Sequence, residues 1–177
     1  MTEFKELLGK SISRLFLVVW PPWGEEKISE TDISFGFVLK NEPNRLCVIS
    51  VDKDELWLPY VTYQSLPQTK YTWDDFCARM TMWMHAEEDT DLIMGFEYYD
   101  VTKCKLFKNI LNSEIIGVEL IRIKDIPEPF GVKILFKDDY IISVPNTDGN
   151  TVETKAFNKH DSVEGFKYLG NVIYSEV

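Results

Sequence analysis

The fold is decided by the stretch LNSEIIGVELIRIKDIPEPFGVKILFKDDYIISVPNTDGNTVETKAF, which covers residues 111–157. It contains short runs of β-branched and aromatic residues that are separated by prolines, acidic residues and a glycine. Such runs, bounded by turn-forming residues, are typical of strands joined by short connections. We therefore expect three or four antiparallel strands here.

Three features of this stretch carry the strand prediction. The apolar residues within 115–123 form a run that is too short and too unbroken for an amphipathic helix, and this predicts a central strand. Pro127 and Pro129 have no N–H for a ladder hydrogen bond, so they mark a crossing between strands. Asp148-Gly149 is a turn signal, because glycine adopts a positive φ without steric cost.

A hairpin is predicted around the polar break Lys137-Asp138-Asp139. Apolar residues fall on alternate positions around the break, and side chains two residues apart on a strand share a face. We expect this face of the hairpin to lie on the core. The residues assigned to it are Ile134, Phe136, Tyr140, Ile142 and Val144.

The first part of the chain has the same character. After a short helix that begins near Thr2, we expect extended segments over residues 12–20, 33–39, 46–51 and 56–63. Shifting the sequence by 103 residues places Ile12 on Ile115, Leu15 on Val118 and Leu17 on Leu120. After changes in loop length, Ile49-Ser50-Val51 meets Ile142-Ser143-Val144.

This likeness suggests an internal duplication of residues 8–63 and 111–157. Duplication predicts two similar β-meanders, which form either two sheets or two halves of one sheet. The alternative is a chance likeness, because any two β-meanders share such a pattern.

Residues 72–87, between the two copies, predict one long amphipathic helix. Thr72 is a suitable N-cap residue, and Asp74 and Asp75 suit the positive end of the helix dipole. Apolar residues recur at helical spacing, and we expect their face to pack on a sheet. They are Trp73, Phe76, Cys77, Met80, Trp83 and Met84. Residues 1–177 then form a single α+β domain that is mainly antiparallel sheet.

The charge of the chain bears on its partners. Its 177 residues carry 29 Asp and Glu against 19 Lys and Arg, which gives a net charge of −10. We expect no nucleic-acid partner, since phosphates are bound by cationic side chains that displace counterions. A basic protein surface is the electrostatic complement of such a chain.

The cysteines and the N-terminus bear on the compartment. Cys47, Cys77 and Cys104 are odd in number and widely spaced, which favours reduced residues of an intracellular protein. The N-terminal residues lack the apolar run of a signal peptide. No segment approaches the roughly 18 apolar residues of a membrane span. We expect a cytoplasmic protein with no membrane partner.

No residue pattern predicts catalysis or a cofactor. The histidines are His85 and His160, and neither lies beside a recognisable nucleophile. Residues 146–150 resemble the start of a calcium loop, but an EF-hand needs a bidentate acid where this chain has Phe157. No two cysteines or histidines have zinc-ligand spacing. We expect neither an enzyme nor a metal or cofactor site.

The chain resembles the small acidic α+β immunity proteins that bacteria encode beside polymorphic or contact-dependent toxins. The likeness lies in size, in charge, and in EIIGVELIRI (residues 114–123) followed by FGVKILFKDDYIISVPNTDGNTVET (residues 130–154). It implies a stoichiometric inhibitor that binds a cognate, basic toxin domain. Such an inhibitor blocks the active site or substrate groove of the toxin.

For such a binder, acidic side chains and aromatic anchors are the candidate contacts. The acidic run after the predicted helix comes first, although a solvated loop is the simpler interpretation of these residues. Acids in turns come next, and two tryptophans beside a loop or a proline are the candidate anchors. The residues are Glu87, Glu88, Asp89 and Asp91; Asp52, Asp54, Glu55, Asp138, Asp139 and Asp148; and Trp23 and Trp57.

Two other functions stay open. A small-molecule-binding domain would show an apolar pocket between the two half-sheets, with a few convergent polar groups. An unrecognised enzyme would show a carboxylate with a strongly raised pKa in a cleft. The oligomeric state is not predicted.

Overall fold

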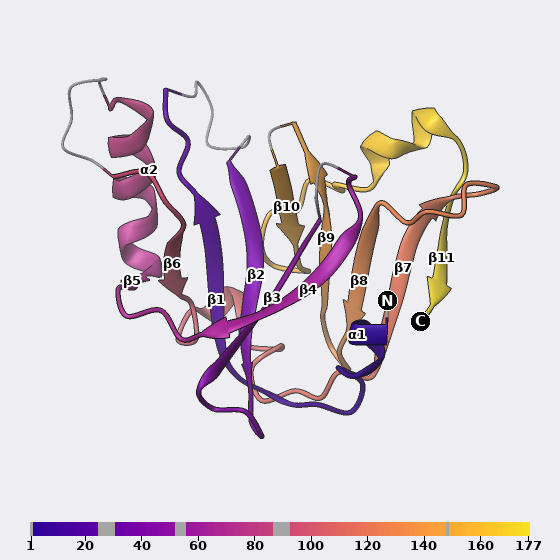
Figure 1. Ribbon diagram of the computed structural model, residues 1–177, viewed down its shortest axis with the longest axis horizontal. Coiled ribbons are helices and arrows are strands. Elements are labelled where there is room, and N and C mark those ends of the chain that lie inside the picture. The colour runs from indigo at the N-terminus through magenta and orange to yellow at the C-terminus, as the bar shows by residue number, and fades with distance from the viewer. Residues whose placement is uncertain (1, 25–30, 52–55, 87–92, 148) are drawn as a thin grey trace.

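The structure is a computed structural model of the chain, and it describes residues 2–24, 31–51, 56–86, 93–147 and 149–177. The described residues form eleven strands in two sheets, with short helices at the margins (Figure 1). All pairings between neighbouring strands are antiparallel except one. The expected α+β class, mainly antiparallel, is confirmed.

The first sheet has six strands in the order β4-β3-β2-β1-β6-β5. Its one parallel pairing joins β5 to β6. The strands are β1 (Ile12–Trp20), β2 (Asp32–Leu39), β3 (Arg45–Val51), β4 (Pro59–Ser65), β5 (Tyr71–Thr72) and β6 (Glu97–Asp100).

The second sheet has five strands in the order β10-β9-β8-β7-β11. They are β7 (Gly117–Ile123), β8 (Gly131–Leu135), β9 (Tyr140–Asn146), β10 (Gly149–Glu153) and β11 (Val172–Glu176). The predicted central strand, β7, lies between β8 and β11, and the two prolines fall in the crossing from β7 to β8.

The predicted long helix is wrong in its length. A 3-10 turn, η2 (Trp73–Asp75), leads into the nine-residue α2 (Phe76–Met84). The start is as expected: the backbone N–H and the hydroxyl of Thr72 both donate to Asp75 Oδ2, at 2.8 and 2.7 Å. The helix ends early in part because the acidic run that follows is unfavourable at the negative end of its dipole.

The other helices are short. They are α1 (Thr2–Lys5), η3 (Lys105–Phe107) and η4 (Glu164–Leu169). None of the helices in the described ranges is long and apolar enough to cross a membrane.

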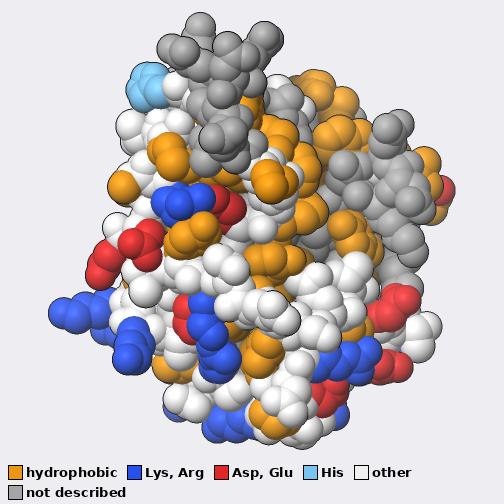
Figure 2. All heavy atoms as spheres, turned by 60° about the vertical axis from the view of Figure 1, so that its left-hand side comes forward, with side chains coloured by type: hydrophobic (Ala, Val, Ile, Leu, Met, Phe, Trp, Pro, Cys, Tyr) orange, Lys and Arg blue, Asp and Glu red, His pale blue; other side chains and the backbone are white. Residues whose placement is uncertain are grey.

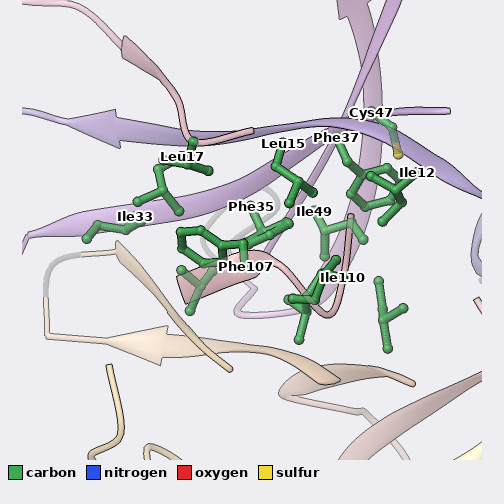
Figure 3. Packing of buried hydrophobic residues seen from close by; sticks show 14 of the residues in the cluster. Ile12, Leu15, Leu17, Ile33, Phe35, Phe37, Cys47, Ile49, Phe107 and Ile110 are labelled. Atoms are coloured by element: carbon green, nitrogen blue, oxygen red, sulfur yellow. The ribbon is translucent and has the colours of Figure 1, made fainter. Parts of the chain in front are cut away.

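One core is shared by the inner faces of both sheets. Leu15 and Leu17 of β1, with Phe35 of β2, point towards Phe107 and Ile110, which belong to the segment between β6 and β7 (Figure 3). Residues of the second sheet, such as Val132 and Ile134, belong to the same cluster. This core joins the two sheets into one unit.

The β8–β9 hairpin corrects the predicted set of inward residues. Ile134 pairs with Ile141, and both lie in the shared core. Ile142 and Val144 lie in a separate cluster with Val163, on the opposite face of the sheet. The reason is the turn: even-numbered residues of β8 pair with odd-numbered residues of β9, so the inward positions change parity across it.

The two sheets follow the same path. In each, a four-stranded meander is followed by a helical segment and then by a strand that pairs antiparallel with the first strand of the meander. The strand pairings place Ile49 opposite Phe35 and Ser143 opposite Val132, so Ile49 corresponds to Ser143. The sequence alignment, which placed Ile49 on Ile142, is one residue out of step there. The likeness is topological, and duplication itself stays a prediction.

The first sheet is strongly curled. Its two edge strands, β4 and β5, are consecutive in the chain, and residues 66–70 join them. Six residue steps span at most about 20 Å, whereas a flat sheet would hold its outer strands about 24 Å apart. In Figure 1, β4 accordingly passes obliquely in front of β3 and β2.

Curling buries the outer face of this sheet in a concave surface, which we call the trough. Its floor is the buried cluster Phe16, Val18, Val38, Leu46 and Val48. Gln64 Nε2 of β4 donates to the Tyr98 hydroxyl of β6 at 3.0 Å, which links the two walls.

Candidate functional site

Most of the acids predicted to contact a partner lie outside the described residues. They are Asp52, Asp54, Glu55, Glu87, Glu88, Asp89, Asp91 and Asp148. Of the other two, Asp138 is exposed in the β8–β9 turn.

Asp139 corrects the expectation of an exposed turn acid, because it is only 3% exposed. Its Oδ1 accepts the backbone N–H groups of Tyr140 and Lys155, at 2.8 and 3.0 Å. The side chain therefore holds the turn against the segment after β10. It does not offer its charge to a partner.

The two predicted aromatic anchors differ in exposure. Trp23 is half-buried, and its ring lies 5.6 Å from that of Trp83 on α2. Trp57, just before β4, is 41% exposed. The structure leaves Trp57 available to a partner and gives Trp23 a packing role.

Exposed apolar side chains gather at one end of the trough, which we call its upper end. β1 ends there at Trp20, and β6 begins beside it, because Val19 pairs with Glu97. The rings of Trp20 and Phe96 make an edge contact at 5.0 Å. Half of the exposed large apolar residues in the described chain belong to this end: Trp20, Leu56, Trp57, Ile93, Met94 and Phe96.

A small pocket opens into the trough at this end, and we call it the upper pocket. Its volume is about 200 Å³. Tyr60 and Gln64 of β4 form one wall, and Phe96 and Tyr98 form the other. This is smaller than the roughly 300–1,000 Å³ of small-molecule sites, and it suits a single side chain of a partner.

The floor of the upper pocket carries hydroxyl groups on an otherwise apolar sheet face. Ser34 and Ser50 line it, and Ser34 Oγ donates to Ser50 Oγ at 2.8 Å. Ser50 Oγ in turn donates to the carbonyl of Val51 at 3.1 Å. Because a hydroxyl has two acceptor lone pairs, this pair retains the capacity to accept from a group that enters the pocket.

The second sheet closes one side of the upper pocket. Asp32, at the rim, accepts the backbone N–H of Asn150 at 3.0 Å. The amide of the buried Asn150 donates to the carbonyl of Ile33 at 2.6 Å and accepts from the N–H of Val51 at 3.2 Å. Gly149 approaches so closely that a Cβ there would lie 2.4 Å from Asp32 Cγ.

A buried carboxylate fixes the wall of the trough to α2. Glu97 accepts hydrogen bonds from Trp83 Nε1 at 2.9 Å, from Arg79 Nε at 3.0 Å and from the Tyr99 hydroxyl. The guanidinium of Arg79 also lies 3.9 Å from the centre of the Tyr71 ring. The start of β6 is thus anchored on the inner side while Phe96 and Tyr98 face the pocket.

The electrostatics of this cluster keep Glu97 ionised. Burial acts to raise the pKa of Glu97, but the hydrogen bonds from Arg79, Tyr99 and Trp83 together outweigh it, and the pKa is lowered. The pKa of Asp100 is lowered as well: burial raises it, and hydrogen bonds from Thr102 and Arg14 overcome this effect. These shifts are opposite in sign to that of a catalytic acid with a raised pKa.

The pocket between the two sheets is small. Its volume is about 240 Å³, and Thr31, Phe76, Thr151, Phe157 and His160 are among its lining residues. Thr31 is 3% exposed, and its hydroxyl has no hydrogen-bond partner within the described ranges.

The sequence did not predict the upper pocket, because this pocket forms only when the first sheet curls. Trp20 was expected only as a strand residue, and nothing local reveals that β4 and β6 face each other across a curled sheet. The alternation of Phe96 and Tyr98 was the available signal, because it places two aromatic rings on one face.

Among the described residues, no three His, Cys, Asp or Glu side chains group together as a metal site would require. Comparison of the chain with protein-family models, with curated proteins and with solved structures found no match.

Proposed function

We propose that the protein is a non-catalytic acidic binding protein of the immunity type, which neutralises a basic toxin domain by direct contact. The contact surface is the upper end of the trough. The observation that carries the proposal is the gathering of exposed aromatic side chains around a pocket that fits one side chain. Aromatic residues around a central pocket are characteristic of the energetic centres of protein interfaces.

The distribution of charge also favours the upper end of the trough as the contact surface. Residues 25–30, 52–55, 87–92 and 148 together contain eleven acids and two lysines, and so carry −9 of the net charge of −10. They connect β1 to β2, β3 to β4, α2 to β6 and β9 to β10. The pairings Trp20 with Asp32, Val51 with Pro59, and Val19 with Glu97 put the adjoining strand ends at the upper end.

Such a distribution suits a basic partner. Acidic residues at the rim of an interface accelerate association with a cationic surface and orient it. The upper pocket adds a specific anchor: a Lys or Arg of the partner enters between the wall of Phe96 and Tyr98 and the wall of β4, towards the Ser34–Ser50 pair. Ring faces attract a cation, and the effect grows when water is excluded.

The test is capture of partners from the native host lysate at low and high salt, with identification by mass. We expect one basic protein that elutes with salt. The captured protein is then produced alone, and its toxic activity is measured while the present protein is added. Loss of activity at a 1:1 ratio supports the proposal.

Two variants locate the surface. Phe96→Ala removes the exposed wall of the upper pocket, and Ile126→Ala removes an apolar side chain of similar exposure, 46% against 53%, in the connection between β7 and β8. We expect Phe96→Ala to weaken the complex at least tenfold, in the range of about 1.4 kcal/mol or more, and Ile126→Ala to leave it unchanged. Equal binding by both variants would remove the upper pocket from the interface.

The small-molecule alternative rests on the pocket between the sheets, where the Thr31 hydroxyl has no hydrogen-bond partner among the described residues and so is a polar group that a ligand can contact. Its volume lies below the usual range for such sites. If no protein is captured while a small molecule raises the melting temperature, this alternative replaces the proposal.

A further inference from the structure

A second cleft opens at the opposite end of β1 and β6, and we call it the lower cleft. Its volume is about 560 Å³, which lies within the usual range for small-ligand sites. Arg14, Lys70 and Lys103 line it together with Tyr71, Trp73 and Cys104. Figure 2, in which the left-hand side of Figure 1 comes forward, shows Lys and Arg side chains spread over the lower half of the view, with acidic and hydrophobic side chains among them.

A β-bulge places Arg14 in this cleft. Ile12 pairs with Leu39 and Arg14 with Val38, so the register of β1 against β2 is irregular between them. Bulges re-aim the side chains beside them and are frequent next to functional sites.

Arg14 neutralises the acid on the cleft wall. Its Nη2 lies 2.8 Å from Asp100 Oδ2, and Asp100 Oδ1 accepts the N–H of Thr102 at 3.1 Å. With the charge of Asp100 satisfied in this way, the remaining cations of the cleft determine its sign.

Lys70 and Lys103 are those cations. Neither amine has a hydrogen-bond or ion-pair partner among the residues that the structure describes. Asp74 supplies the opposing charge on the wall, so the lining carries three cations against two acids. The lining of the lower cleft is therefore cationic, although the chain as a whole has a net charge of −10.

We propose that the lower cleft binds a small organic anion with a flat apolar body. The body lies against the apolar wall formed by Tyr71, Trp73 and Cys104, and the anionic group lies beside Lys70 and Lys103. The upper pocket is chemically the reverse, so the two sites select ligands of opposite charge. This site is independent of the proposed binding of a toxin domain.

The test uses the cysteines as reporters. Cys104 lines the cleft and is half-buried, Cys77 is exposed on α2 outside it, and Cys47 is buried. The intact protein is alkylated with iodoacetamide, which is neutral, and modification of each cysteine is followed by peptide mass mapping. The probe is 1-naphthyl phosphate, compared with 1-naphthol and with inorganic phosphate.

We expect 1-naphthyl phosphate to slow the alkylation of Cys104 at least fivefold while Cys77 reacts at its original rate. 1-Naphthol and inorganic phosphate each lack half of the proposed ligand, and we expect both to protect weakly. Absence of protection by 1-naphthyl phosphate, or equal protection by 1-naphthol, overturns the proposal.

Matched variants test the lysines. Lys70→Gln with Lys103→Gln removes two charges from the cleft, and Lys105→Gln with Lys108→Gln removes two exposed charges that do not line it. We expect the first pair to raise the dissociation constant of 1-naphthyl phosphate at least tenfold and the second to leave it unchanged. Equal affinity in both double variants overturns the assignment of the anionic group to Lys70 and Lys103.

Discussion

The two ends of the trough are built by the same two strands from opposite chemistry. At the upper end Trp20 and Phe96 meet edge to face, and at the lower end Arg14 and Asp100 form an ion pair. Alternate residues of a strand share a face, so Trp20 and Arg14 lie on the trough side of one strand, with Phe16 and Val18 buried between them. One curled sheet face thus provides both of the proposed sites.

The largest expected effect comes from the residue that holds β6 in place between these ends. Glu97→Gln leaves the Arg79 guanidinium beside Trp83 and Tyr99 without its anion. We expect the free energy of unfolding to fall by about 3 kcal/mol, as when one partner of a buried pair is removed. Urea unfolding measures this loss. We expect binding at the upper pocket and at the lower cleft to weaken together, because β6 contributes to both.

The control is an ion pair of the same kind at the surface. Glu42→Gln removes the partner of Arg45, whose nitrogen lies 3.1 Å from the Glu42 carboxylate in an exposed position. A loss under about 0.5 kcal/mol is expected there. If Glu97→Gln costs no more than Glu42→Gln, β6 is not held by this cluster.

A smaller effect is expected from a substitution that alters the upper pocket and leaves the lower cleft intact. Gly149→Ala places a methyl group within 2.4 Å of Asp32 Cγ, whereas Gly95→Ala has open space around its new Cβ. We expect Gly149→Ala to lower the free energy of unfolding by about 1–3 kcal/mol through overpacking. It also displaces Asp32 at the upper pocket and leaves ligand protection of Cys104 at the lower cleft unchanged.

Gly95→Ala is expected to change neither property. Loss of the lower cleft in Gly149→Ala would show that the two ends are coupled. Unchanged stability in that variant would show that Asp32 and β10 move apart easily.

The smallest expected effect is on the pH dependence of stability. The pKa of Asp100 is lowered in the folded state, so its contribution to stability is present above the ordinary carboxyl pKa, roughly 4. It is lost as the pH falls through the lowered value. Arg14→Gln removes one cause of the shift, and we expect it to cost about 0.5–1 kcal/mol near neutral pH and less in acid.

Urea unfolding between acidic and neutral pH measures the difference between the two proteins. A constant difference across this range would show that Arg14 acts through packing on Phe16, whose ring centre lies 5.0 Å from the guanidinium, rather than through Asp100.

Local patterns predicted the strands well, because alternation and turn residues are encoded within a few positions. The strand expected over 12–20 is β1 itself, and those expected over 33–39 and 46–51 differ from β2 and β3 by one residue at the start. The wrong predictions concern features that depend on residues outside the local pattern. The inward face of the β8–β9 hairpin depends on the parity of its turn, and the length of α2 depends on the charges after it.

The candidate site was less accessible to sequence reasoning. Tyr60 lies far in the chain from Phe96 and Tyr98, and it meets them because residues 66–70 draw the edges of the sheet together. Asp139 has the sequence context of an exposed turn acid, yet two backbone N–H groups bind it in the interior.

The position of β6 also sets an order of assembly. β1 pairs with β2 soon after it in the chain, but its other edge waits for residues 97–100. During synthesis, that edge stays open while the chain between β2 and β6 is made, and open edges invite pairing with other chains. β6 ends this exposure and brings the aromatic wall of the upper pocket with it. A nascent chain therefore completes the proposed contact surface at the step that covers this open strand edge.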